Sequence, residues 1–229
     1  LRQLDLAENW NISTMGWRAI FTQLQSPHSS LEDLCVTENY IDDAAAMLLA
    51  NALANNSKLK ILILSSINKI TTDGWQAIFD AVQSPHCQLE RLDLICNQFC
   101  DNDVTNLANS FANNCALRYL DLSYNRFTSL GWRAFSVVLT NPDSALEMVN
   151  LGYNDINDDA LVSFGTSLLH NDKLKALLLD DVEEDINITI TGWDALLNVL
   201  CSKSSIDATF NSNHTLQRIF AEEHNDSLM

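Results

Sequence analysis

A short template that recurs along the chain is the feature that most constrains its fold. In the segment Leu117–Asn125, leucines stand at the first, fourth and sixth positions, an asparagine ends the segment, and Phe127 follows. This spacing fits neither an amphipathic helix nor an alternating strand, but it is typical of one turn of a repeat array. The same template begins at Leu1, Leu31, Leu59, Leu89, Leu117, Leu146 and Leu174. We therefore expect a solenoid in which each repeat contacts its neighbours.

A second signature shows that the repeats alternate in type. Odd-numbered repeats carry a Gly-Trp pair at the start of an apolar segment, with the glycines at Gly16, Gly74, Gly131 and Gly192. Even-numbered repeats replace it with acidic starts, at Asp42-Asp43, Asn102-Asp103 and Asp158-Asp159. Since repeats of the same type start 57 or 58 residues apart, the structural unit is a pair of repeats.

With this alternation, the chain from Leu1 to about Leu216 resembles the ribonuclease-inhibitor class of leucine-rich repeat proteins. The resemblance implies an α/β solenoid, a right-handed horseshoe with a parallel concave sheet and helices on the convex side. Seven repeats would occupy residues 1–205. A degenerate C-terminal capping repeat and polar tail would occupy 206–229, where polar residues 211–214 replace the apolar strand core.

Within each repeat, the template predicts a short strand, a turn and a helix. We expect Asn125 and its equivalents to satisfy backbone groups in the turns, because a bent loop leaves such groups unpaired. Ile67 and Val182 replace this asparagine in repeats 3 and 7, which predicts distorted loops there. The equivalents of Asn125 are Asn9, Asn39, Asn97 and Asn154.

The helices are predicted from apolar residues spaced by three and four, such as Trp132, Phe135 and Leu139, after a cap at Thr128 or Ser129. This spacing makes the signature tryptophans core residues rather than a functional aromatic site. One repeat buries too little apolar surface to fold alone. The uncovered repeat at Leu1 therefore predicts a missing cap or further repeats upstream.

The charge balance narrows the class of partner. The chain holds 30 acidic and 13 basic residues, a formal net charge of −17. Such a protein repels phosphate backbones and anionic lipid, and the absence of a long apolar run argues against membrane insertion. A protein partner with a basic or mixed surface is favoured, without nucleic acid.

The six cysteines lack the paired spacing of a zinc site or of a dense disulfide framework. This usage favours reduced thiols and an intracellular, cytoplasmic location. A secreted or cell-surface protein is the alternative, for which glycans at the sequons of Asn187 or Asn213 would be the sign.

The candidate binding residues stand between the template leucines, where side chains face the concave side of the sheet. They combine an apolar and aromatic middle with surrounding carboxylates, as protein interfaces do. The predicted protein-binding set is Ile61, Ile63, Asp93, Ile95, Tyr119, Asp121, Tyr124, Met148, Tyr153, Asp180 and Asp181. Exposed apolar residues on a sheet indicate that something covers them.

The acidic loop 180–185 can be interpreted in three ways: as a calcium site, as a binding site for a basic partner, or as a run of charged residues exposed to solvent. It lacks the glycine and the alternating Asp/Asn spacing of a calcium loop, which favours the solvated run.

Catalytic chemistry has no support in the sequence. His28 and His86 occupy the same loop position in repeats 1 and 3, and no nucleophile pattern, metal-ligand spacing or phosphate-binding glycine loop accompanies them. We therefore predict a non-catalytic recognition scaffold without cofactor or metal. The resemblance leaves two alternatives, because its class also includes Ran GTPase-activating proteins and the ligand-sensing domains of nucleotide-binding receptors.

Overall fold

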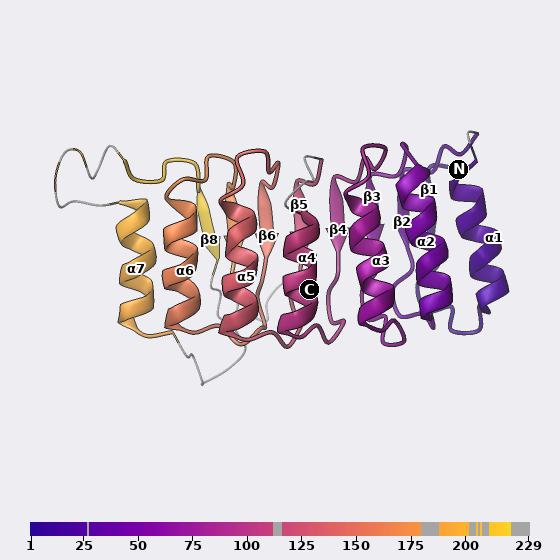
Figure 1. Cartoon of the computed structure of the whole chain (residues 1–229), viewed down its shortest axis with the longest axis horizontal. Coiled ribbons are helices and arrows are strands. Elements are labelled where there is room, and N and C mark those ends of the chain that lie inside the picture. The colour runs from indigo at the N-terminus through magenta and orange to yellow at the C-terminus, as the bar shows by residue number, and fades with distance from the viewer. Residues whose placement is uncertain are drawn as a thin grey trace, which may run out of the picture.

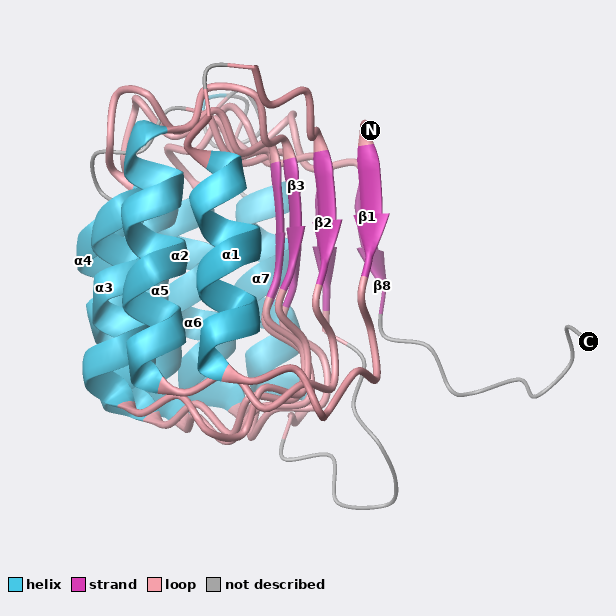
Figure 2. Ribbon diagram, turned by 90° about the vertical axis from the view of Figure 1, so that its right-hand side faces the viewer, coloured by secondary structure: helices cyan, strands magenta, loops and turns pink. Residues whose placement is uncertain are grey.

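The computed structural model describes residues 1–26, 28–111, 116–179, 188–201, 205, 207 and 211–220. The acidic loop, with Asp180 and Asp181, lies outside these residues. Within them the chain forms one parallel sheet of eight strands in sequence order, and the helices all cover the same face of it (Figures 1 and 2). We call the opposite, uncovered face the open face; it is the concave side of the predicted horseshoe. The prediction of an α/β leucine-rich repeat solenoid is confirmed.

Strands and helices alternate along the whole described chain. The strands are β1 (Gln3–Asp5), β2 (Asp33–Cys35), β3 (Ile61–Ile63), β4 (Arg91–Asp93), β5 (Tyr119–Asp121), β6 (Met148–Asn150), β7 (Ala176–Leu178) and β8 (Arg218–Phe220). The helices are α1 (Thr14–Leu24), α2 (Asp43–Asn55), α3 (Thr72–Val82), α4 (Asp101–Phe111), α5 (Ser129–Leu139), α6 (Asp158–Leu168) and α7 (Ile190–Leu200). None of these helices is long and apolar enough to cross a bilayer.

The leucines of the template face the helices, as predicted. Leu62 and Leu120, in the middle of β3 and β5, are fully buried, whereas their neighbours Ile61 and Tyr119 are only partly covered on the open face. Successive side chains of a strand point to opposite faces, so the template fixes the orientation of every strand. The register pairs Leu62 with Leu92 and Leu92 with Leu120.

The asparagines form the predicted ladder through the turns. Asn125 donates through Nδ2 to the carbonyl oxygens of Leu122 (2.9 Å) in its own repeat and Leu94 (3.1 Å) in the preceding one. Its Oδ1 accepts from the backbone N–H of Asn97 (2.9 Å) and Phe99 (3.0 Å). Asn39 and Asn154 also donate to carbonyl oxygens of their own and of the preceding repeat, so these side chains satisfy backbone groups of two successive repeats.

The prediction of a distorted loop at Ile67 is wrong. The preceding Ser66 has φ 57°, close to the φ of 56° at Tyr124, so this turn has the same left-handed residue as its neighbours. The side chain of Ile67 is fully buried, and its backbone N–H donates to Oδ1 of Asn97 at 2.7 Å. The next repeat supplies a bond that keeps this turn in shape. Val182, in repeat 7, lies outside the described residues.

The helices build the core with the predicted aromatic residues. Trp17, Trp75 and Trp132 are at most 2 % exposed, and Trp132 packs edge-on against Phe164 of the next helix with ring centroids 5.2 Å apart. Trp193, in the last helix, is half-buried. The core interpretation of the signature tryptophans is confirmed for the first three, because their side chains are almost completely covered.

A contact that the sequence reasoning missed explains the pairing of repeats. The first residue of each even helix is an aspartate, and its carboxylate accepts hydrogen bonds from the start of the following odd helix. Thr128 donates to Asp101 through its N–H (2.7 Å) and its hydroxyl (2.9 Å), and the Gly131 N–H adds a third bond (3.0 Å). We call the two bonds from the threonine to the aspartate, beside the helix glycine, the carboxylate staple; its three copies are Asp43–Thr71–Gly74, Asp101–Thr128–Gly131 and Asp158–Thr189–Gly192.

The staple also explains the glycine of the Gly-Trp signature. A Cβ built on Gly131 would lie 2.8 Å from Oδ1 of Asp101, and one on Gly192 would lie 2.5 Å from Oδ1 of Asp158. A side chain at these positions would therefore collide with the carboxylate. In agreement, α2 packs more extensively against α3 than against α1, and the same holds for the later stapled pairs.

The eighth strand lies later in the chain than the sequence suggested. β8 pairs with β7 in the register of Ala176 with Arg218, so Leu216 takes the first template position and residues 211–214 precede the strand. Asn213 accepts from the N–H groups of Thr215 and Leu216 (both 2.9 Å), as Asn171 does from Lys173 (3.0 Å). The polar segment is therefore the loop that leads into an eighth repeat.

Candidate functional site: the open face of the sheet

The parallel register sets the predicted binding residues side by side in two rows across the open face. The first row runs through Ile61, Arg91, Tyr119 and Met148, and the second through Ile63, Asp93, Asp121 and Asn150. Ile95, Tyr124 and Tyr153 follow the strands, in the turns at their carboxyl ends. The site prediction thus converges on the middle of the sheet, around β3 to β6.

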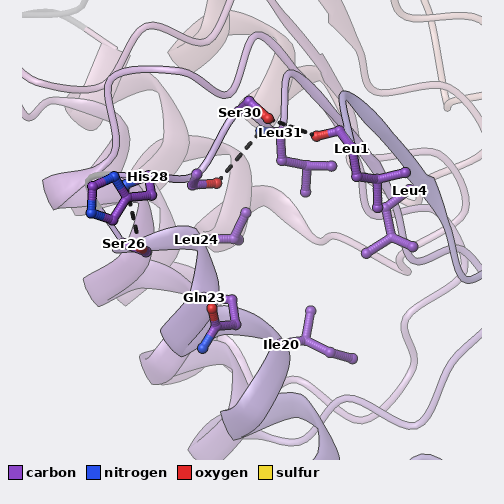
Figure 3. A pocket seen from close by; sticks show the side chains of 10 residues that line it. Leu1, Leu4, Ile20, Gln23, Leu24, Ser26, His28, Ser30 and Leu31 are labelled. Atoms are coloured by element: carbon purple, nitrogen blue, oxygen red, sulfur yellow. Dashed lines mark hydrogen bonds between the residues drawn. The ribbon is translucent and has the colours of Figure 1, made fainter.

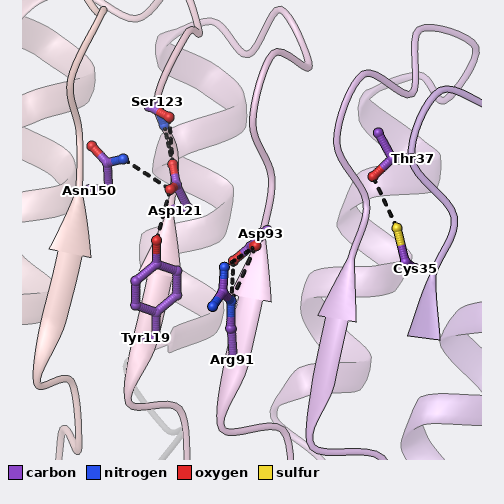
Figure 4. Close-up of polar contacts among 8 residues, drawn as sticks. All are labelled: Cys35, Thr37, Arg91, Asp93, Tyr119, Asp121, Ser123 and Asn150. Atoms are coloured by element: carbon purple, nitrogen blue, oxygen red, sulfur yellow. Dashed lines mark hydrogen bonds and ion pairs between the residues drawn. The ribbon is translucent and has the colours of Figure 1, made fainter. Parts of the chain in front are cut away.

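Arg91 and Asp93 form an ion pair within one strand, because residues two apart in a strand share a face. The Arg91 Nε lies 3.0 Å from Oδ1 of Asp93, and Nη2 lies 2.7 Å from Oδ2 (Figure 4). The guanidinium carbon also lies 4.4 Å from the ring centroid of Tyr119 on the next strand. Burial raises the pKa of Asp93, against the lowering effect of Arg91.

Asp121 is the acceptor of a second network. Its carboxylate accepts from the hydroxyl groups of Tyr119 (3.0 Å) and Ser123 (2.6 Å) and from Nδ2 of Asn150 (2.9 Å) (Figure 4). Burial, together with the neighbouring negative charge of Asp121, raises the pKa of the Tyr119 hydroxyl. Tyr119 therefore stays neutral at physiological pH, and its hydroxyl donates a hydrogen bond to Asp121.

The two networks change the role that the sequence suggested for the central carboxylates. Asp93 is 2 % exposed and Asp121 is 4 % exposed, and both are engaged by side chains of this chain. A partner would meet the Arg91 guanidinium, the Tyr119 ring and the half-buried Ile61, Ile63 and Met148 before it reached either carboxylate. We interpret Asp93 and Asp121 as groups that position the residues above them.

Among the described residues of the open face, exposed carboxylates lie at its N-terminal end. Asp5, Glu8 and Glu38 are exposed, and Asp33 is half-buried and accepts from Nε2 of Gln3 at 2.6 Å. The open face is therefore divided into an acidic part at β1 and β2 and an apolar and aromatic part from β3 to β6. In this acidic part Cys35 has its Sγ 3.4 Å from the Thr37 hydroxyl (Figure 4).

Two tyrosines stack at the carboxyl-end edge of the sheet. The rings of Tyr124 and Tyr153, in successive turns, are 4.0 Å apart between centroids and tilted by 10°. Both residues have φ 56°, in the left-handed region, which costs a residue with a Cβ roughly 1 kcal/mol or more. Tyr124 is 47 % exposed. Glu8, Glu38, Ser66 and Cys96 have the same left-handed backbone in the other turns, so the conformation belongs to the repeat, and the exposed aromatic ring is what distinguishes this pair.

A row of alternating charges, which the sequence reasoning missed, runs along the opposite edge of the sheet. The residue after the first template leucine is basic in odd repeats and acidic in even repeats. In chain order these residues are Arg2, Glu32, Lys60, Glu90, Arg118, Glu147 and Lys175. Neighbours pair across the sheet: Lys60 lies 2.9 Å from Glu90, and Glu147 binds both Arg118 and Lys175. A comparison of the second template position across all repeats shows this alternation in the sequence.

Among the residues that the structure describes, no group of three or more His, Cys, Asp or Glu side chains is placed to hold a metal ion. The described cysteines are free thiols, with Cys87 buried and Cys96 and Cys100 exposed. Asn213, the asparagine of one of the two glycosylation sequons named above, is buried. Its side-chain amide nitrogen donates to the carbonyl oxygens of Leu168 (2.5 Å) and Asn171 (2.8 Å). In the folded chain this nitrogen is therefore covered.

Comparison with protein families supports the repeat architecture. A family model described as Leucine Rich repeat matches residues 113–136. The chain is 28 % identical over 219 residues to NACHT, LRR and PYD domains-containing protein 14 of Mus musculus, an alignment that covers 96 % of this chain and 20 % of that protein. It is 28 % identical over 169 residues to NACHT, LRR and PYD domains-containing protein 9 of Bos taurus, covering 74 % of this chain and 17 % of that protein. The chain thus spans about one fifth of the length of these relatives.

Among solved structures, the chain is similar to the structure described as Leiomodin-1 Actin-Binding Site 2 (ABS2). The TM-score is 0.47 at 14 % sequence identity, over 81 % of this chain and 87 % of that chain. A chain of the Rad7 and Elc1 complex in yeast gives a TM-score of 0.46 at 18 % identity, over 83 % of this chain and 54 % of that chain.

Proposed function

We propose that this leucine-rich repeat protein is a non-catalytic recognition scaffold that binds a partner protein on the open face of its sheet. The observation that carries the proposal is the stacked pair of Tyr124 and Tyr153 at the edge of a half-exposed apolar surface. Buried aromatic and arginine anchors dominate the energetics of protein interfaces. Tyr124, Tyr153, Arg91 and Tyr119 supply such anchors on adjacent repeats.

The charge distribution supports a partner with a mixed surface. A basic region of the partner would face Asp5, Glu8 and Glu38, while an apolar region would cover Ile61, Ile63 and Met148. Exposed carboxylates raise the association rate with a basic partner more than they raise the affinity, and salt screens the effect. Neutralising Glu8 and Glu38 with glutamine should therefore slow association at low salt and flatten its salt dependence.

The variant Tyr124→Asn tests the proposed site. Asparagine is tolerated in left-handed backbone, so this change removes the exposed ring without adding strain. Proteins that bind the intact array should be lost from affinity capture with Tyr124→Asn, and measured Kd values for purified partners should rise at least tenfold. Val137→Ser, on the helical side, is the matched control, because Val137 is 63 % exposed and lies on the face opposite the site. Equal binding by both variants and the intact array would place the interface elsewhere.

A second reading is that the array serves as the repeat domain of a larger, ligand-sensing protein. The alignment with NACHT, LRR and PYD domains-containing proteins supports it, because 96 % of this chain aligns with one fifth of such a protein. An antibody raised against the folded array should then detect, in native extracts, a polypeptide several times longer than 229 residues. A native product of about this length would contradict the reading.

A further inference from the structure

The backbone groups of the open face are already used within the sheet. Successive strands from β1 to β8 are hydrogen-bonded neighbours, so the N–H and C=O groups of the inner strands pair with those of adjacent strands. The polar side chains in the middle of the face are engaged as well, Asp93 by Arg91, and Asp121 by Tyr119 and Asn150. A segment that covers this surface therefore has to satisfy its own backbone groups.

An α-helix meets this condition, because its N–H and C=O groups bond to each other within the helix. An extended segment laid across the strands does not meet it. Such a segment would bury its backbone groups against apolar side chains such as Ile61 and Met148, where they would lose their bonds to water without gaining others. A helix is therefore the single segment that this surface can cover without leaving backbone groups unpaired.

The dimensions of the open face match a helix that lies along the array. Each strand is three residues long, about 10 Å, which is close to the diameter of a helix with its side chains. Neighbouring strands lie about 4.8 Å apart, and a helix advances about 5.4 Å per turn. Successive turns therefore place one side chain over each successive strand. Side chains on one face of an extended segment are about 6.6 Å apart, and they lose this match after about two strands.

The register gives the order of contacts along such a helix. The helix would cross first the acidic part at β1 and β2, where Glu8 and Glu38 are exposed, and then the apolar and aromatic part from β3 to β6, where Ile61 and Met148 are half-buried. Carboxylates attract basic side chains, and aliphatic or aromatic side chains are stabilised on an apolar surface. The charge and apolar character of the open face therefore specify a different type of side chain for each end of the helix.

Two hollows of the protein do not belong to this surface. One, of about 390 Å³, is lined by Leu1, by Leu4 of β1 and by Ile20 of α1 (Figure 3). The other, of about 290 Å³, is lined by Trp75 and Phe99 among others. Neither hollow is lined by a residue of the two rows or of the tyrosine pair on the open face. A helix on the open face would therefore contact the rows of side chains and leave both hollows uncovered.

We propose that the partner element on the open face is an amphipathic α-helix of about five turns that lies along the array. Its contacting side is basic over about two turns, which face the acidic part, and aliphatic or aromatic over the following turns, which cover Ile61, Ile63 and Met148. Its role rests on the function proposed above for the open face. A helix that is apolar along its whole contacting side does not fit, because it would bury the carboxylates of Glu8 and Glu38 without partners.

Three synthetic peptides of equal composition test the proposal on the full chain. In the phased peptide, arginines and then leucines recur at helical spacing on one side, and this peptide is made in both chain directions. In the second peptide the same residues alternate with the period of a strand. In the third, the helical spacing is kept but the arginines stand between the leucines. By fluorescence anisotropy, we expect the Kd of the phased peptide in its better direction to be at least tenfold lower than that of either isomer, with binding that weakens as salt is added.

Variants of the chain test whether the phased peptide lies on the open face. Ile61→Thr keeps a β-branched side chain but removes apolar surface, and should raise the Kd at least threefold. Val137→Thr is the matched control on the helical side, where Val137 is 63 % exposed, and should leave the Kd unchanged. Glu8→Lys combined with Glu38→Lys should abolish binding of the phased peptide and restore binding to a peptide with glutamates in place of the arginines.

The outcomes separate this helix from the function of the open face. Equal affinities of the three peptides, no binding of any of them up to about 1 mM, or equal effects of Ile61→Thr and Val137→Thr would overturn the helix. A preference for the alternating peptide would assign the surface to an extended segment instead. In each of these cases, loss of captured proteins with Tyr124→Asn would still support the proposed function. Equal capture by Tyr124→Asn and the intact array would remove both.

Discussion

The backbone N–H of Gly131 donates to the carboxylate of Asp101 at 3.0 Å, across the boundary between two repeats. The same oxygen lies only 2.8 Å from the place that a Cβ at position 131 would take. One hydrogen bond therefore accounts for both halves of the alternating pattern, the glycine of odd repeats and the acidic start of even helices. It also makes the pair of repeats, rather than the single repeat, the unit that is stabilised.

The first prediction concerns the glycines. Gly74→Ala should destabilise the chain by about 1–3 kcal/mol, because the new methyl group overlaps Asp43 Oδ1 and Ile70 Cγ2. Gly16→Ala is the matched control, since Gly16 faces Ile12 Cγ2 in the same way but no carboxylate. That control should change stability by less than about 1 kcal/mol, because only the half-buried Ile12 methyl group must shift and alanine favours helix. Urea unfolding of both variants measures the difference, and equal losses would refute the staple as the cause.

The second prediction concerns acid stability. Hydrogen bonds from the Thr189 hydroxyl and backbone hold the pKa of Asp158 below its ordinary value. A carboxylate with a lowered folded pKa stabilises the fold above its unfolded pKa, near 4, and this contribution disappears as pH falls through the folded pKa. Thermal unfolding of Asp158→Asn should therefore differ most from the parent at pH 5–7 and converge with it toward pH 2–3.

Asp159→Asn controls for the loss of one negative charge at the start of α6. Asp159 is exposed and adjacent to Asp158. A pH-dependent difference of the same size in Asp159→Asn would attribute the effect to net charge instead of the staple.

The third prediction concerns the asparagine ladder. Asn125→Ala removes three bonds donated by Nδ2 and two accepted by Oδ1, and leaves buried backbone groups of two repeats unsatisfied. We expect a loss of about 3 kcal/mol in the free energy of unfolding. Faster amide exchange should appear at Asn97 and Phe99, in the neighbouring repeat. Faster exchange confined to the turn around residue 125 would show that the ladder does not couple repeats.

The fourth prediction concerns Tyr124. Tyr124→Asn relieves roughly 1 kcal/mol of left-handed strain but loses stacking on Tyr153 that is worth about 0.5–1.5 kcal/mol. The free energy of unfolding should therefore change by less than about 1 kcal/mol, as denaturant titration will measure. A much larger loss would mean that the pair is needed for the fold. Tyr124→Gly provides a second variant with the same expectation.

The sequence predicted the architecture because its information is local and periodic. The spacing of Leu117, Leu120 and Leu122 determines which side chains of a strand face the helices, since successive residues of a strand point to opposite faces. Trp132, Phe135 and Leu139 determine the buried side of a helix in the same way. Residues such as Ile61 and Tyr119 were therefore assigned to the correct face.

The contacts that side chains make between repeats could not be predicted from the sequence periodicity. Asp93 and Asp121 were assigned to the binding surface by their orientation, and the structure adds that Arg91, Tyr119, Ser123 and Asn150 cover or engage them. Periodicity states where a side chain points but not which partner it meets. The prediction of a distorted turn at Ile67 was wrong for the same reason, because the hydrogen bond that stabilises this turn comes from Asn97 in the next repeat.

The amino-acid sequence by itself determined the repeat, its strand and helix, the direction of each side chain and the alternation of two repeat types. Only the tertiary structure decided the carboxylate staples, the pairing of charges along the sheet edge, the coverage of the central carboxylates and the place of the eighth strand. These features depend on the lateral spacing and register of neighbouring repeats. Stacking sets both quantities, and residues about 28 positions apart in the chain become neighbours only when the array has formed.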